Sequence, residues 1–396
     1  MPGFELFGEE ECKEVNDVLA TGVLMRYNFD VARQGHWKAK KLEETIQEKF
    51  ETKFVHLTSS GTTALITALN TLGIGTGDEV IMPTFTFVAS FEAILTVGAI
   101  PVLTDINNSL TLDPQAVGKK ISPRTKAIMP VHMCGGMADL DPLIALCKKH
   151  NLYLLEDACQ AIGATYKGKY LGTIGDIGCL SFDYVKTVTC GEGGAVLTHN
   201  EDLYRKADNY SDHGHDHQGH DRGAENHHFI GLNFRISELH AAVGLAQFKK
   251  LGRILEVQRK NKQFIKEKLI SISGISFRRL PDPNGDNASS LSIFLPSETQ
   301  ARKLYTMSKT EQIGGGAYWY DNHWHYLRNW DHLKKLKILA PLPQEVKDAV
   351  LRHAQEHHAA SDEIMSRTLT FNISLWDETQ AEIQAKKIYN LVKKNL

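Results

Sequence analysis

Short apolar runs alternate with amphipathic stretches along the chain from about residue 53. The apolar runs have the length and the β-branched or aromatic content of buried strands. Between the earlier ones, segments such as 62–72 and 142–150 carry apolar residues at helical spacing. This alternation predicts an α/β fold with a mainly parallel sheet that helices cover on both faces. The predicted strands are 54–57, 79–82, 100–104, 127–132, 152–155, 179–182 and 194–197.

Two further helical segments bear on the domain organisation. Residues 9–20 form an amphipathic segment, and residues 237–270 carry apolar side chains at helical spacing. Segment 281–288 is rich in Pro, Asn, Asp and Gly, which predicts a loop. Because the sequence pattern changes inside or just after the long helix, we predict a large domain at 1–250 and a smaller α+β domain at 251–396.

Composition narrows the class of protein. The 396 residues are 42% hydrophobic and 23% charged, and the formal net charge of -2 favours neither nucleic acid nor an anionic membrane surface. No apolar run is long enough to cross a bilayer, and the first residues lack the features of a signal peptide. The six cysteines form no CxxC pair and no disulfide framework. These features predict a cytoplasmic protein that binds neither nucleic acid nor membrane.

The first candidate for chemistry is the segment from Thr58 to Leu65, where a turn rich in hydroxyl groups and glycine joins a strand to a helix. The N–H groups of a first helical turn are unpaired and carry partial positive charge, so they suit a phosphate group. Gly61 would let a ligand approach the backbone closely. Taken alone, an ordinary helix cap is the more common reason for such residues.

The second candidate is Asp157, which follows Glu156 at the end of the apolar strand 152–155. A carboxylate at the carboxyl end of a parallel strand lies in the ligand crevice of an open α/β sheet. There it can pair with a pyridinium nitrogen and keep that nitrogen protonated. An acidic residue that complements a helix dipole is an equally good interpretation.

The third candidate is Lys186, which follows a predicted strand and precedes the glycine-rich turn 191–194. A catalytic amine needs a depressed pKa, which burial or neighbouring positive charge supplies. A solvated lysine beside a turn is the common alternative. Together, the three candidates favour the functional interpretation over the ordinary ones. A phosphate cradle, a pyridinium partner and an amine follow one another at strand ends of one predicted sheet.

These segments resemble the DegT/DnrJ/EryC1/StrS family of sugar aminotransferases, which are fold-type I enzymes that use pyridoxal 5'-phosphate (PLP). The resemblance implies the architecture of that class, with a mainly parallel seven-stranded sheet in the large domain and a smaller α+β C-terminal domain. It covers residues 10–250 through Ser60-Gly61-Thr62-Thr63-Ala64-Leu65, Pro83-Thr84-Phe85-Thr86-Phe87-Val88-Ala89, Pro130-Val131-His132, Glu156-Asp157-Ala158-Cys159-Gln160, Ser181-Phe182 with Lys186 and Gly191-Glu192-Gly193-Gly194, and Gly231-Leu232-Asn233-Phe234-Arg235.

The resemblance implies that four of these residues act on the cofactor ring. Lys186 would hold PLP as a Schiff base and carry protons, and Asp157 would pair with the ring nitrogen. Phe87 would stack on the ring, and Gln160 would contact the ring hydroxyl. One branch of the family has histidine in place of the lysine and acts as a sugar 3-dehydratase, so Lys186 favours transamination.

The resemblance implies a phosphate site as well. Gly61, Thr62 and Ser181 would hold the phosphate from within the chain. Asn233 would reach the phosphate of a neighbouring subunit, so we expect a homodimer with sites at the subunit interface. The expected ligands are a small sugar substrate and an amino-acid donor.

Segments 211–217 and 314–326 depart from the common family pattern. With 24–28, they resemble a narrower branch that transfers the amino group of glutamate to the C8 aldehyde of 3,8-dideoxy-8-oxo-manno-octulosonate. The product would be 8-amino-3,8-dideoxy-manno-octulosonate for lipopolysaccharide. Arginine and histidine can pair with the carboxylate of such a sugar acid. The predicted substrate contacts are Arg26, His215, His217, Tyr318 and His323.

Other interpretations stay open. The acceptor could be a nucleotide-linked keto sugar, and a non-catalytic PLP-binding regulatory protein would need no working lysine. The histidines of 213–220 alternate with Gly and Asp and include no Cys, so we predict no metal site, and a flexible loop or a substrate contact explains them as well. For the aromatic cluster around Tyr318, packing in the small domain is the more common reason.

Overall fold

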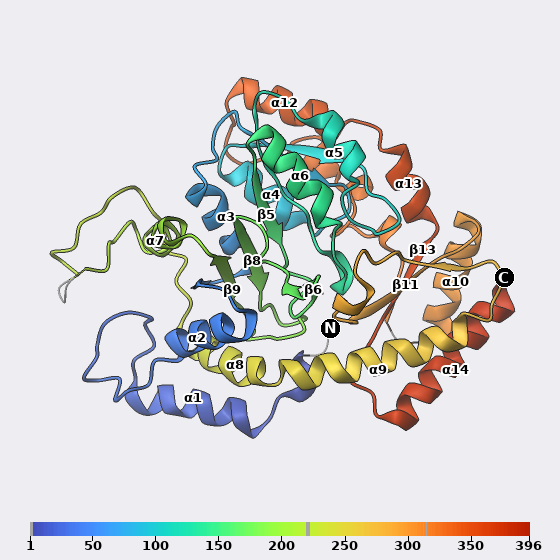
Figure 1. Ribbon diagram of the computed structural model, residues 1–396, viewed down its shortest axis with the longest axis horizontal. Helices are drawn as coiled ribbons and strands as arrows, with labels where there is room; N and C mark the ends of the chain where they lie inside the picture. Colours follow the sequence, from blue (N-terminus) through green and yellow to red (C-terminus); the bar gives the residue numbers. More distant parts are fainter. Residues whose placement is uncertain (1–2, 219–221, 312, 314) are drawn as a thin grey trace.

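The computed structural model describes residues 3–218, 222–311, 313 and 315–396, and a seven-stranded sheet forms its centre (Figure 1). All neighbouring strands are parallel except at β9, which runs antiparallel to β8 and β1. The predicted mainly parallel sheet is therefore confirmed. In the order of the sheet, the strands are β1 (Phe54–Thr58), β9 (Gly194–Thr198), β8 (Ile177–Ser181), β5 (Tyr153–Asp157), β4 (Thr125–Ile128), β2 (Glu79–Pro83) and β3 (Ile100–Thr104).

Strand β4 ends earlier than the predicted strand 127–132, and Pro130 explains the difference. Proline has no N–H group and cannot donate into a central ladder. The pairing resumes beyond it, because the Asp157 N–H donates to the Pro130 carbonyl (3.0 Å) and the His132 N–H donates to the Asp157 carbonyl (2.9 Å). The chain thus stays beside the end of β5.

Helices pack on both faces of this sheet. Helix α3 lies against β8 and β9, α4 against β3, and α6 against β5. The core between them is apolar and closed to water: Leu69, Ile81 and Leu155 are fully buried. Burial of each such side chain stabilises the fold by about 1.5–3 kcal/mol. These helices are α3 (Gly61–Thr71), α4 (Val88–Thr96), α5 (Pro114–Lys120), α6 (Leu140–His150) and α7 (Glu201–Tyr210).

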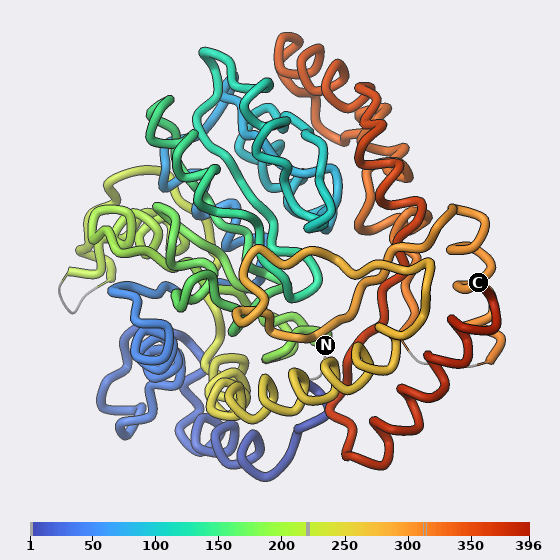
Figure 2. The backbone as a smooth tube through the Cα atoms, turned by 45° about the vertical axis from the view of Figure 1, so that its right-hand side comes forward, coloured from blue at the N-terminus to red at the C-terminus, as the bar shows by residue number. Residues whose placement is uncertain are grey.

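The predicted helix 237–270 consists of two helices, α8 (Glu238–Lys249) and α9 (Leu251–Leu269), which meet at Lys250. Helix α8 packs against α1 (Glu9–Thr21) and α2 (Lys38–Phe50). Helix α9 packs against α14 (Glu378–Asn395), and the two lie side by side in Figures 1 and 2. The Lys250 ammonium fixes the junction by donating to Glu11 (2.7 Å).

A second, four-stranded antiparallel sheet lies beyond α9, with strands β10 (Ser276–Phe277), β11 (Ser290–Phe294), β13 (Thr368–Asn372) and β12 (Gly316–Ala317). It has its own apolar core, to which Leu291 and Phe371 belong. The chain between β12 and β13 returns to the large sheet, because α12 packs on β3 and Trp330 lies in the first core. The domain division at residue 250 stays a prediction.

The remaining elements are short or peripheral. Every cysteine is free, and none of the helices in the described part of the chain combines the length and apolar character that a bilayer crossing needs. These elements are η1 (Gly3–Leu6), η2 (Met133–Gly135), β6 (Thr165–Tyr166), β7 (Lys169–Tyr170), η3 (Pro283–Gly285), α10 (Glu298–Thr310), η4 (Trp319–Asp321), η5 (Leu327–Asn329), α11 (Asp331–Lys334), α12 (Gln344–Ala354) and α13 (Ala359–Ser366).

Candidate active site

A cavity of about 180 Å³ lies at the carboxyl ends of β5 and β8, beside the N-termini of α3 and α4. Seven of the eight predicted cofactor contacts line it, and only Asn233 does not. They come together because each follows the end of a strand or begins a helix, and parallel strands end at one edge of a sheet. The seven are Gly61, Thr62, Phe87, Asp157, Gln160, Ser181 and Lys186.

The N-terminus of α3 leaves bare backbone at one side of the cavity. The Ser60 hydroxyl accepts from the Thr63 N–H (3.1 Å), while the N–H groups of Gly61 and Thr62 find no acceptor within the described chain. A Cβ on Gly61 would lie 2.7 Å from the Cβ of Ser181, so only glycine fits there. Unpaired N–H groups at the positive end of a helix dipole suit an anion such as phosphate.

Asp157 supplies the carboxylate of the cavity. Its backbone is held on both sides by Pro130 and His132, and one carboxylate oxygen accepts from the Ser90 hydroxyl (2.7 Å). The other accepts from the Cys159 N–H (3.2 Å). The side chain is only 3% exposed, so its orientation is fixed and its charge acts in a medium with little water. Sequence reasoning missed Ser90, although it directly follows a recognised motif.

Lys186 supplies the amine. It lies in the turn after β8, where its N–H donates to the Asp183 carbonyl (2.9 Å) and its carbonyl accepts from the Gly3 N–H (3.1 Å). Within the described residues, its ammonium has neither a hydrogen bond nor an ion pair. An amine without a fixed partner at the wall of a cavity is free to react with a ligand there.

An aromatic group closes another wall of the cavity. The Phe87 ring stacks on Trp324 at 5.7 Å and contacts the ring of His325 at 5.3 Å. Burial lowers the pKa of His325 to about 4, and the positive charge of Lys186 adds to this effect. His325 is therefore a neutral imidazole at physiological pH, able to donate or accept a hydrogen bond beside the amine.

The cavity fits PLP. It combines an open helix N-terminus for the phosphate, a buried carboxylate for a ring nitrogen, an aromatic face and an unpartnered amine. Gln160 adds a polar group, held by the Cys134 N–H at its side-chain oxygen (3.4 Å). The individual contacts of these residues with the cofactor remain predictions.

The five predicted substrate contacts lie elsewhere in this chain. Arg26 is buried and donates to Glu43 (2.5 Å), whereas the His215 ring lies 3.1 Å from a carboxylate oxygen of Glu225. His217 lies between two aspartates. Tyr318 is buried in the second core, as the packing interpretation predicted, and His323 is exposed. The aromatic segment instead brings His325, which sequence reasoning missed, to the cavity. Substrate roles for the five therefore remain predictions, and within one chain none of them lines the cavity.

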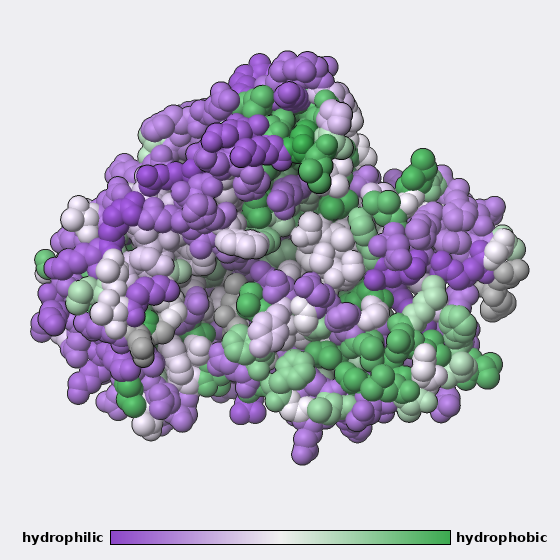
Figure 3. Space-filling model, turned by 180° about the vertical axis from the view of Figure 1, so that it is seen from behind, coloured by the Kyte–Doolittle hydropathy of each residue, from purple (hydrophilic) through white to green (hydrophobic). Residues whose placement is uncertain are grey.

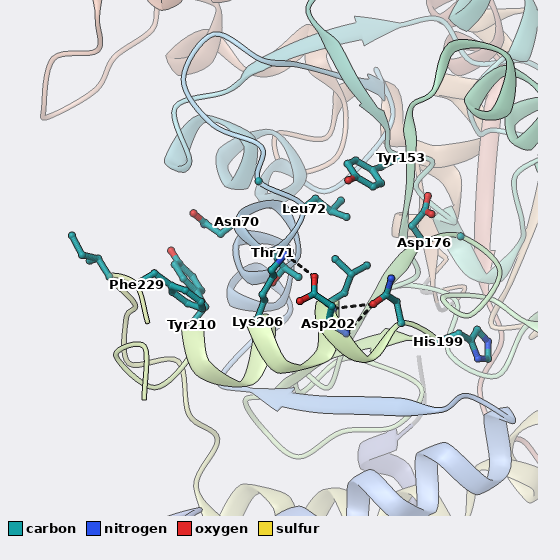
Figure 4. Close-up of a pocket in the computed structure, with 15 residues that line it drawn as sticks. Asn70, Thr71, Leu72, Tyr153, Asp176, His199, Asp202, Lys206, Tyr210 and Phe229 are labelled. Carbon is teal, nitrogen blue, oxygen red and sulfur yellow. Dashed lines mark hydrogen bonds and ion pairs between the residues drawn. The ribbon is translucent and has the colours of Figure 1, made fainter. Parts of the chain in front are cut away.

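Asn233 is exposed and outside the cavity of its own chain. A larger hollow, of about 800 Å³, lies at the other end of α3, between the residues that end this helix and α7 (Figure 4). The carbonyl end of a helix repels anions, and Asp202 and Lys206 pair with each other across this wall (2.7 Å). This hollow therefore lacks the features that suit a phosphorylated cofactor. Across the described residues, no group of His, Cys, Asp or Glu is arranged to hold a metal ion.

Comparison with known proteins identifies the class that this fold and cavity define. The model of the DegT/DnrJ/EryC1/StrS aminotransferase family matches residues 6–364. The chain belongs to this family, which confirms the predicted family and its cofactor, PLP.

Two relatives carry the name GDP-perosamine synthase. The protein of Caulobacter vibrioides is 39% identical over 216 residues, which are 53% of this chain and 56% of that protein. The protein of Vibrio cholerae is 35% identical over 309 residues, or 74% and 81% of the two chains. The chain thus spans little more than half the length of the first relative.

Solved structures match over nearly the whole chain. An aminotransferase from Psychrobacter cryohalolentis has a TM-score of 0.82 at 26% identity, with 98% of each chain covered. NtdA from Bacillus subtilis, solved with bound cofactor PMP, has a TM-score of 0.80 at 25% identity, with 99% of this chain and 84% of that chain covered. The predicted fold class is confirmed.

Proposed function

We propose that this protein transfers an amino group from an amino-acid donor to the carbonyl carbon of a sugar. The single observation that carries the proposal is the free amine of Lys186 in one cavity with Asp157 and the open N-terminus of α3. PLP supplies an electron sink for the electron pair that a departing proton leaves behind.

In this proposal, each of several cavity residues has a separate role. The N–H groups of Gly61 and Thr62 bind the phosphate, and the Asp157 carboxylate keeps the ring nitrogen protonated. Ser90 orients that carboxylate through its hydroxyl (2.7 Å). The Lys186 amine would take the α-proton of the amino-acid donor and return it to a carbon of the cofactor. His325, held by Asn322 (3.0 Å), lies beside the amine, where it can orient a substrate hydroxyl.

For the acceptor we propose the C8 aldehyde of 3,8-dideoxy-8-oxo-manno-octulosonate, with glutamate as the donor. Support comes from the segment 314–326, which departs from the family pattern and supplies His325 to the cavity and Trp324 to the face of Phe87. A nucleotide-linked keto sugar is the second candidate. The names of the relatives from Caulobacter vibrioides and Vibrio cholerae favour it.

We propose a homodimer as the active form. Segment 22–37 exposes Leu24, Phe29 and Val31, and Val31 is 94% exposed. Figure 3 shows apolar surface gathered low on the rear face, at the lower right of that view. Burial of such side chains against a second copy would remove apolar area from water. Light scattering that gives a monomer mass at micromolar concentration would contradict this proposal.

The variant Lys186→Ala tests the covalent step. The wild type with PLP should absorb as an imine, and borohydride should fix the cofactor on Lys186. The variant should show neither signal and should lose at least about 10³-fold in transamination rate, because no other amine lies in the cavity. Lys206→Ala, in the hollow at the other end of α3, is the control and should keep both signals. A wild type without measurable transamination, whose other functions stay intact in Lys186→Ala, would favour the non-catalytic alternative.

A direct comparison of acceptors tests the specificity. Purified protein with PLP and glutamate is offered the octulosonate aldehyde or a nucleotide-linked keto sugar, and 2-oxoglutarate release is followed. Release with the octulosonate aldehyde alone supports the first proposal. Release with the nucleotide-linked sugar alone would replace it with the second candidate.

A further inference from the structure

The histidine-rich segment has no part in the proposed chemistry, yet its base lies next to the cavity. Residues 211–218 and 222–235, here called the arm, extend from the end of α7 and lead back to β1 (Figures 1 and 2). The Ser59 N–H donates to the Phe234 carbonyl (2.8 Å), and Arg235 pairs with Thr58 as an antiparallel bridge. The base of the arm is therefore hydrogen-bonded to the residues that lead into the turn at Gly61.

One carboxylate joins the two sides of this base. Asp212 is fully buried, and its backbone bridges to Asn233. Its side chain accepts from Nε2 of His217 (2.9 Å), from both Nη atoms of Arg222 (2.8 and 3.0 Å) and from Arg235. Burial opposes ionisation of Asp212, but the hydrogen bonds and the three positive charges outweigh it and hold its pKa well below the ordinary value.

A second carboxylate extends the network to other parts of the chain. Asp208, on α7, accepts from Nδ1 of His217 (2.8 Å) and from the Tyr27 hydroxyl (2.7 Å). The Tyr27 ring also stacks on His217 at 4.1 Å. His56 of β1 faces the same carboxylate (3.2 Å). The arm is thus tied to α7, to β1 and to the segment before α2.

We propose that Asp212 is a positioning residue, which fixes the base of the arm and so the place from which Asn233, by the predicted role, would contact the cofactor phosphate of a neighbouring subunit. The inference rests on the proposed function. Asn233 is exposed in its own chain, where its side-chain oxygen accepts from the Arg235 N–H (3.4 Å) and its backbone bridges to Asp212. Ordering a long loop costs free energy, because conformational entropy is lost. The hydrogen bonds of one carboxylate to three cations offset part of that cost. Without the carboxylate, three positive charges meet at the base with no anion between them.

The affinity for pyridoxamine 5'-phosphate tests this inference, because that molecule binds without a covalent link to Lys186. We expect Asp212→Asn to weaken its binding by about tenfold, measured by fluorescence titration at pH 7.5. Asp105→Asn is the matched control. It removes a carboxylate that accepts from the N–H (3.0 Å) and the hydroxyl (2.6 Å) of Ser361, away from the arm. The control should lower thermal stability and leave the affinity unchanged.

A double-mutant cycle separates positioning from general loss of structure. If Asp212 acts through Asn233, the double variant should bind no more weakly than Asn233→Ala alone. Additive losses, or wild-type affinity in Asp212→Asn, would overturn the inference. If Asp212→Asn does not fold, Arg222→Gln serves in its place, because it removes one of the three cations. This variant should bind pyridoxamine 5'-phosphate several-fold more weakly. Wild-type affinity in Arg222→Gln would also overturn the inference. A wild type that forms no imine with PLP would instead overturn the proposed function.

Discussion

Backbone hydrogen bonds hold both the polar groups of the cavity and the base of the arm, but the arm adds a network of ion pairs around the buried carboxylate of Asp212. Asp157 is held by Pro130 and His132 within the edge of the sheet, and its charge is not needed for that. The contribution of Asp212 and His217 to the arm depends on their charges. Loss of a charge should therefore reduce activity in the cavity with little effect on stability, whereas in the arm it should lower stability.

Among the variants that test this comparison, the largest effect should come from Asp157→Asn, which keeps the size of the side chain and removes its charge. We expect kcat/KM to fall by about 10²–10³-fold, because a neutral amide does not hold the ring nitrogen protonated. The midpoint of thermal unfolding should change little. Steady-state kinetics and calorimetry check the two expectations. Ser90→Ala, which removes one hydrogen bond to the same carboxylate, should cost only about tenfold. A large loss of stability in Asp157→Asn would end the contrast between cavity and arm.

A steric change in the cavity should have the next largest effect. In Gly61→Ala the new methyl group would lie 2.7 Å from the Cβ of Ser181. We expect a loss of about 2 kcal/mol in the free energy of unfolding and weaker cofactor binding. Gly252→Ala, in α9, is the control: the nearest atom is 4.0 Å away, so the helix should gain about 0.5–1 kcal/mol. Denaturant unfolding measures the free energy of unfolding of both variants. Equal changes in Gly61→Ala and Gly252→Ala would show that the close contact with Ser181 is relieved without loss of stability.

The contribution of the arm to stability should depend on pH. Burial opposes the charge of His217, but Asp208 and Asp212 outweigh it and raise its pKa to about 9. A raised folded-state pKa contributes stability that is complete below about pH 6.5 and is lost as the pH rises through about 9. The side chain is partly exposed, so we expect a loss of about 1–2 kcal/mol across that window. Urea unfolding at pH 6.5 and 9.5 measures it, and His217→Asn should flatten the difference. A wild type equally stable at both values would contradict the role of this ion pair.

Local signals explain why so much of the cavity was predictable. Asp157 ends β5, whereas Gly61 and Lys186 follow β1 and β8 within a few residues, and the order of strands and helices then places all three at one edge. Ser90 was missed because its partner Asp157 is distant in sequence, although its position one turn into α4 was predictable in principle. His323 was predicted from the sequence and His325 was missed, because only the fold shows that Asn322 accepts from the Trp324 N–H and holds the His325 ring.

The arm shows the opposite case. A sequence rich in His, Asp and Arg is compatible with a metal site, a mobile loop or a set of ion pairs. Only the packing of α7, β1 and the segment before α2 decides among them. Arg26 illustrates the point, since packing places it beside Glu43 of α2 within its own chain, and its predicted contact with a substrate carboxylate stays a prediction.

By itself, the sequence determined the approximate positions of the seven strands and the mainly parallel sheet, because hydrophobic periodicity is a local property of the chain. Its resemblance to a known family indicated seven of the residues that line the cavity. The tertiary structure alone decided which charged side chains pair and which histidine reaches the cavity. Coulombic and hydrogen-bond partners are chosen by distance in space, and that distance is set only when separate elements pack together.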